Sequence, residues 1–126
     1  MKTNTFALIT GGLLFALTAN VSQAGGRYTN PPAGLVESFD LCTKGLEAAK
    51  AGNKDVALEN AKKARKISLD SYKEISTMPM EIASSSMKKA LASLDAGDVA
   101  GSIPAFEHCT TKLADEIDYY KKEGKL

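Results

Sequence analysis

Apart from Met1, six side chains of this sequence carry sulfur or imidazole nitrogen and could bind a soft metal ion. They are Cys42, Cys109, Met78, Met80, Met87 and His108, the last being the only histidine. Met78 and Met80 form a Met-x-Met pair at a predicted helix start. Two thioethers at this spacing can bind Cu(I) in an oxidising compartment. The alternative interpretation is that both are ordinary apolar residues that close one end of a helical bundle.

His108 is a separate candidate ligand. Its predicted helical neighbours Thr111, Lys112 and Asp115 are polar, which favours a surface histidine. In an antiparallel bundle, however, Met87, His108 and the two cysteines lie at one height. That layer could hold Cu(I) if the thiols were reduced. A disulfide would remove two of the four ligands.

The remaining polar groups provide little for catalysis. Asp115, Glu116 and Asp118 accompany Tyr119-Tyr120 on the last predicted helix. They could bind a hard cation weakly, but a solvated face is the simpler interpretation. The chain has no CxxCH haem-attachment motif, no Gly-rich phosphate loop, no GxSxG and no HExxH. We therefore predict that the protein is not an enzyme.

The N-terminal segment 1–24 has the pattern of a cleavable signal peptide. Lys2 precedes a mostly apolar run at 6–19, and Val21-Ser22-Gln23-Ala24 places small residues at the −3 and −1 positions. A transmembrane anchor is the alternative. The run is shorter than the roughly 20 residues that a spanning helix needs, and Gly11-Gly12 interrupts it. We expect a periplasmic or secreted mature chain with no membrane span.

The mature chain has no net charge. Removing residues 1–24 removes one lysine, which leaves 15 basic and 15 acidic residues with His108 neutral. Nucleic acids and anionic membranes both select basic surfaces. We therefore expect no nucleic-acid partner, while an unknown protein partner remains open.

Apolar spacing predicts four helices after a turn-rich, flexible leader at 25–34, which we interpret as a linker. The predicted ranges are approximately 35–51, 54–75, 79–96 and 99–122. Gly52-Asn53 and Gly97-Asp98 each combine a helix stop with a helix start. Pro79 fits the first position of the third helix. Pro104 should bend the fourth helix or delay its start to near Ser102.

Each predicted helix has one inward stripe. The second stripe is made mainly of small residues, which lets a neighbouring helix approach closely, and Lys62, Lys63, Lys66 and Lys73 form the opposite, solvated face. The four stripes are Leu35, Phe39, Cys42, Leu46 and Ala49; Ala57, Ala61, Ala64, Ser68, Ser71 and Ile75; Ala83, Met87, Ala90 and Leu94; and Val99, Ile103, Phe106, Cys109, Leu113, Ile117 and Tyr120.

The two halves of the chain are related by a shift of 45 residues. The shift places Lys44 on Lys89, Leu46 on Leu91 and Gly52 on Gly97. A single helical hairpin cannot bury its apolar face, whereas two can. Short loops imply antiparallel neighbours. The sequence therefore predicts an all-α, up-down four-helix bundle over 35–126.

The bundle predicts a disulfide between Cys42 and Cys109. The Gly52 and Gly97 turns lie at one end, and the cysteines are ten and twelve residues away from them. Both therefore lie roughly 15–18 Å below that end at about 1.5 Å per residue. The first and last helices are neighbours, so a bridge is feasible. Free thiols with a metal or redox role are the alternative.

Two segments resemble the helical hairpins of the small metal-binding protein family. They are LEAAKAGNKDVALENAKKA (46–64) and LASLDAGDVAGSIPAFEHC (91–109). The resemblance implies an exported four-helix bundle that binds divalent metals, including copper, through many histidines. Only His108 is available here, so no other ligand is carried over. The two segments also resemble tetratricopeptide hairpins, but those repeat every 34 residues and the shift here is 45. Cytochrome b562-like bundles share the predicted size and topology, but they bind haem through a methionine on the first helix and a histidine late in the fourth, and this sequence has neither.

Two functions follow from the sequence. The first is a small periplasmic protein that binds a metal ion, with copper as the favoured ion, or another small ligand. Its candidate ligands are His108, Met78, Met80 and Met87. The second is an interaction or structural accessory protein without a metal. Alternating charge on the outer faces favours the second.

Overall fold

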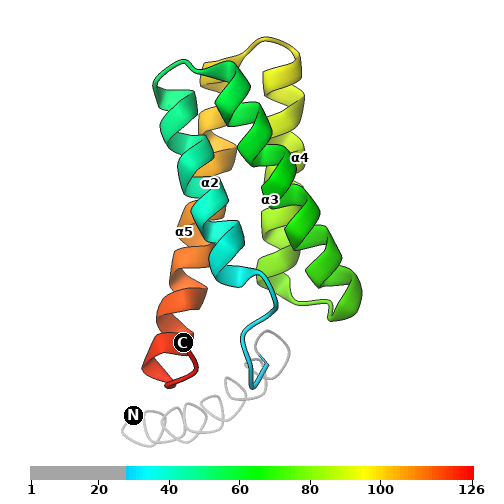
Figure 1. Cartoon of the computed structure of the whole chain (residues 1–126), viewed down its shortest axis with the longest axis vertical. Helices are drawn as coiled ribbons and strands as arrows, with labels where there is room; N and C mark the ends of the chain where they lie inside the picture. Colours follow the sequence, from blue (N-terminus) through cyan, green and yellow to red (C-terminus); the bar gives the residue numbers. More distant parts are fainter. Residues whose placement is uncertain (1–27) are drawn as a thin grey trace, which may run out of the picture.

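A computed structural model describes residues 28–126, and the predicted signal peptide lies outside the described residues. The described residues form four helices, which pack side by side with alternating direction (Figure 1). They are α2 (Leu35–Lys50), α3 (Lys54–Glu74), α4 (Met78–Asp95) and α5 (Val99–Lys122). Each helix packs on the helices before and after it in the chain, and α2 also packs on α5. The predicted up-down four-helix bundle is confirmed.

Two matching turns join the helices at one end of the bundle. Figure 1 shows both at the end away from the C-terminus. Gly52 and Gly97 have φ values of 75° and 82°, in the left-handed region that glycine adopts without strain. In both turns the residue after glycine donates its N–H to a carbonyl five residues earlier, which closes a Schellman motif. This shared geometry explains why the Gly-Asn and Gly-Asp signals predict the helix ends.

The same two turns also start the next helices. The Asn53 side chain accepts a hydrogen bond from the Val56 N–H, and the Asp98 side chain accepts one from the Gly101 N–H. These caps satisfy N–H groups that the first helical turn leaves without partners. Because Asp98 caps α5 directly, the helix begins at Val99, and the predicted delay to Ser102 is wrong. Pro104 is contained within α5.

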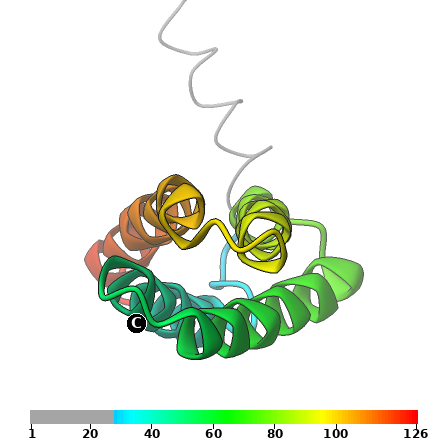
Figure 2. The same cartoon turned by 90° about the horizontal axis from the view of Figure 1, so that it is seen from above.

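The core combines small side chains on α3 with larger ones on α4 and α5. Figure 2 shows the bundle along its axis, with α2 and α3 on one side and α4 and α5 on the other. All but one of the residues in the predicted stripes are buried or half-buried. The fully buried side chains include Ala57, Ala61, Ala64, Met80, Met87, Leu94, Phe106 and Leu113.

The boundary between α3 and α4 differs from the prediction. The structure ends α3 at Glu74, and Ile75 has an extended backbone with its side chain 53% exposed. The prediction of an inward Ile75 is wrong because the residue no longer follows the helical period. The next helix begins at Met78, which makes Pro79 its second residue. The N–H groups of the first helical turn have no acceptor within the helix. Proline, which has no N–H, therefore loses no hydrogen bond at this position.

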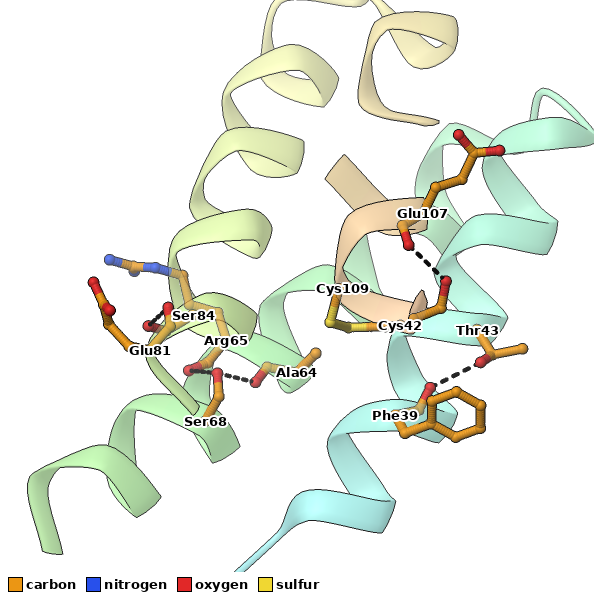
Figure 3. Close-up of a disulfide and its surroundings, with 11 residues drawn as sticks. Phe39, Cys42, Thr43, Ala64, Arg65, Ser68, Glu81, Ser84, Glu107 and Cys109 are labelled. Atoms are coloured by element: carbon orange, nitrogen blue, oxygen red, sulfur yellow. Dashed lines mark hydrogen bonds between the residues drawn. A yellow bond between two sulfur atoms is a disulfide. The ribbon is translucent and has the colours of Figure 1, made fainter. Parts of the chain in front are cut away.

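A buried disulfide joins α2 to α5, as Figure 3 shows. The Cα atoms of Cys42 and Cys109 are 6.3 Å apart, and both residues are fully buried. The predicted pairing is confirmed. Within residues 28–126, no helix is long and apolar enough to cross a membrane.

Candidate functional site

The described part of the N-terminal leader folds back against the lower end of the bundle. We call residues 28–33 the strap. The backbone N–H of Tyr28 donates to the hydroxyl of Tyr120 at 3.2 Å, and that hydroxyl donates to the Tyr28 carbonyl at 2.9 Å. The Tyr28 hydroxyl donates to the Ser76 carbonyl at 3.4 Å. These bonds attach the strap both to α5 and to the α3–α4 turn.

A groove lies between the strap and the end of α3. Its volume is about 470 Å³, and its lining comprises the strap together with Ser71, Glu74, Ile75 and Thr77. The Tyr28 ring, the two strap prolines and Ile75 make much of this lining apolar. Pro32 is buried, whereas Tyr28 and Ile75 remain 43% and 53% exposed at the rim. Small-molecule sites commonly have volumes of about 300–1,000 Å³ and mainly apolar walls with few polar groups.

Thr77, one of the residues that line the groove, has a buried hydroxyl without a hydrogen-bond partner in the described residues. The residue is 3% exposed, and its hydroxyl has no hydrogen-bond partner among residues 28–126. It occupies the position before α4, yet its side chain makes no capping hydrogen bond. Leaving a buried hydroxyl unsatisfied costs about 1–3 kcal/mol. A movement of the side chain that let this hydroxyl hydrogen-bond to a ligand would recover this free energy.

The predicted methionine ligands point in different directions. Met78 is 56% exposed, whereas Met80 and Met87 are fully buried in the core. Residues two positions apart on a helix differ in direction by about 200°. The helical start at Met78 therefore separates the two thioethers of the Met-x-Met pair.

His108 also lies apart from the exposed methionine. It is exposed on α5 and borders a small hollow with Ser86, Lys89 and Ser93 of α4. Met78 begins α4, so Ser86 lies about 12 Å further along the helix axis. Two ligands of one metal ion lie much closer to each other than that. Residues 28–126 also contain no group of three or more His, Cys, Asp or Glu side chains placed to hold a metal ion.

The polar face predicted on the last helix is only partly solvated. Asp118 is exposed and pairs with Lys122 at 3.1 Å. Glu116 and Tyr120 are instead buried, at 8% and 1% exposure. The prediction of a solvated face is therefore wrong for Glu116, whereas Tyr120 is buried as its place in the inward stripe predicts. The ring of Tyr120 packs edge-on against Tyr119 and its hydroxyl holds the strap.

Comparison with protein-family models, with curated proteins and with solved structures finds no match for this chain. The described residues, 28–126, form a disulfide-linked, all-α four-helix bundle. The resemblance to the small metal-binding protein family stays a prediction. The groove was not predicted from the sequence, since the leader was interpreted as a linker. Tyr28 and Pro31-Pro32 are the signal that could have indicated a docked segment, because an aromatic ring and two prolines are suited to packing.

Proposed function

We propose that the mature chain is an exported, non-catalytic binding protein whose groove takes one small, mainly apolar ligand. The single observation that carries the proposal is the groove itself, with the buried and unsatisfied Thr77 hydroxyl in its lining. Apolar walls favour transfer of apolar surface from water. A small movement of the Thr77 side chain would offer its hydroxyl to the ligand as a donor and an acceptor. The ligand class that suits this lining has an apolar body and one hydrogen-bonding group.

The sequence predicted a protein that binds either a metal ion or another small ligand, and this proposal is the second of these. Copper binding by His108, Met78, Met80 or Met87 is the competing proposal. The distance along α4 between Met78 and the hollow that His108 borders from α5, and the burial of Met80 and Met87 in the core, favour the groove. A third candidate is a protein partner that docks on the exposed side chains of Ile75 and Met78 at the same end of the bundle.

The proposal can be tested with N-phenyl-1-naphthylamine, a neutral apolar probe whose fluorescence rises on leaving water. The chain has no tryptophan to interfere. We expect saturable binding of one probe molecule to the protein purified from a bacterial periplasm. Ile75→Ala should weaken binding about fivefold to tenfold, because it removes part of an apolar wall. Val56→Ala is the matched control, since Val56 is 41% exposed in the first turn of α3, remote from the groove.

Equal affinities for the Ile75→Ala and Val56→Ala variants would refute the groove as the binding site. Copper titration of the same preparations tests the competing proposal. Stoichiometric copper binding that is lost on joint substitution of Met78, Met80 and His108 would instead support the metal function.

A further inference from the structure

A second hollow lies between α3 and α4 and is lined largely by cations. Its volume is about 290 Å³, and its lining includes four basic residues, Lys62, Arg65, Lys66 and Lys73. Leu69 and Leu91 contribute apolar surface, and Asp70 is the one acidic residue in the described lining. We call this site the basic hollow.

The basic residues share one face of α3. Lys62, Lys66 and Lys73 lie with Leu69 at spacings of three or four residues, so these side chains follow one line along the helix. Arg65 lies three residues after Lys62, beside this line. The line is about 16 Å long. Asp70 cancels only one of the four positive charges, and its carboxylate accepts a hydrogen bond from Lys66 at 2.9 Å. This hydrogen bond lowers the pKa of Asp70 and keeps the carboxylate ionised. Three positive charges remain in excess in a mature chain with no net charge.

Arg65 adds an unsatisfied donor to this site. Its Nε atom is buried and has no hydrogen-bond partner among the described residues. Figure 3 shows the guanidinium group extending from α3, with Glu81 of α4 on the same side. No ion pair joins the two side chains within residues 28–126. Glu81 is nevertheless the carboxylate whose repulsion a bound anion would feel.

We infer that the basic hollow binds an oxyanion group of the phosphate type. Arg65 would donate hydrogen bonds from its planar guanidinium, the geometry that suits phosphate oxygens. Lys62, Lys66 and Lys73 would supply positive charge along the same face. The phosphate group could belong to a soluble compound or to a lipid headgroup, because both present the same oxygens. This site is separate from the groove and does not depend on the groove's ligand.

An NMR titration with sodium phosphate tests the inference on the full exported protein. Sodium chloride at matched ionic strength is the reference. We expect saturable amide shifts confined to residues 62–73 and their neighbours on α4. The double variant Lys62→Gln/Lys66→Gln should bind phosphate about tenfold more weakly. Glu81→Gln should bind more tightly, because it removes a nearby negative charge.

The matched control is Lys121→Gln/Lys122→Gln on α5. Each double variant removes two charges and one i, i+4 ion pair, Lys66–Asp70 in one case and Lys122–Asp118 in the other. Co-sedimentation with phosphatidylglycerol vesicles separates the two sources. Sedimentation that the Lys62/Lys66 variant abolishes assigns the site to lipid headgroups, and phosphate binding without sedimentation assigns it to soluble phosphates. Shifts that never saturate, or equal weakening by both double variants, would overturn the inference.

Discussion

Gly45 shows how one residue fixes the approach of two helices. It is buried on α2, and a Cβ atom built there would overlap the ring of Phe106 on α5. Phe106 is itself fully buried. A flat aromatic ring thus takes the space that a side chain would need. The close contact of α2 and α5 therefore depends on glycine at this position.

Gly45→Ala should lower the free energy of unfolding by about 1–3 kcal/mol, because an added methyl group overpacks the core. Urea unfolding followed by circular dichroism measures this change. Phe106→Leu alone should also destabilise the protein. Combining the two should cost less than the sum of the single changes, since the smaller side chain gives room to the methyl group. Strict additivity would show that Gly45 and Phe106 do not compete for this space.

Thr77 gives a second prediction at the scale of the residue. Thr77→Val removes a buried hydroxyl that has no partner in residues 28–126 and keeps the shape of the side chain. We expect the free energy of unfolding to rise by about 1 kcal/mol. Thr43→Val is the control, because the Thr43 hydroxyl donates to the Phe39 carbonyl at 2.9 Å. That change should lower stability, and a similar loss for Thr77→Val would mean that the Thr77 hydroxyl is satisfied.

At the scale of the element, the strap forms one wall of the groove, and the end of α3 forms the other. It is held by the two hydrogen bonds between Tyr28 and Tyr120, across 92 residues of sequence. Tyr120 is 1% exposed, so its hydroxyl is fixed by the packing of its ring. The groove should therefore keep its shape only while this tyrosine keeps its hydroxyl.

Tyr120→Phe removes both hydrogen bonds and leaves the ring in place. We expect faster amide hydrogen exchange in residues 28–33 and weaker probe binding, with the exchange of the helix interiors unchanged. Tyr72→Phe, a hydroxyl deletion at a half-buried position on α3, is the control. Unchanged strap exchange in the Tyr120→Phe variant would show that packing alone holds the strap.

Sequence reasoning predicts the helices closely and the groove not at all. The Gly52-Asn53 and Gly97-Asp98 signals are local, and they place the ends of α2 and α4 and the starts of α3 and α5 to within one residue. Ile75 was misplaced because the exit from α3 interrupts the helical period. The groove depends on contacts between residues 28 and 120, and no local pattern encodes such a contact. The unsatisfied groups of Thr77 and Arg65 likewise become visible only once their surroundings are packed.

At the scale of the whole molecule, the disulfide closes most of the bundle into one loop. Cys42 and Cys109 are 67 residues apart and link the first described helix to the last. In the chain-entropy account, a loop of this length stabilises the folded state by about 4 kcal/mol. The free energy of unfolding of a domain is only about 5–15 kcal/mol. The bridge therefore contributes a large part of the stability.

Reduction of the disulfide should lower the melting temperature by roughly 15–30 °C, as expected for a loss of about 4 kcal/mol in a domain of this size. Calorimetry with and without a reductant measures the shift. A Cys42→Ala/Cys109→Ala variant should melt near the reduced protein and show no response to reductant. Equal melting temperatures for the oxidised and reduced proteins would contradict the stabilising role.

Export can be tested on the same molecule by intact mass spectrometry of the periplasmic fraction. The predicted mature chain begins at Gly25, and its mass is lower than that of the reduced chain by two hydrogen atoms. Retention of residues 1–24 would instead favour the membrane anchor. A bound, stoichiometric copper ion in the native spectrum would favour the competing metal function.

The most direct test of the account is an isotope-filtered nuclear Overhauser experiment on the protein saturated with N-phenyl-1-naphthylamine. The proposed function predicts contacts between the aromatic protons of the probe and the methyl groups of Ile75 and Thr77, which line the groove. Contacts with Val56 instead, or with no single cluster of methyl groups, would contradict the claim that the groove beneath the strap is the binding site.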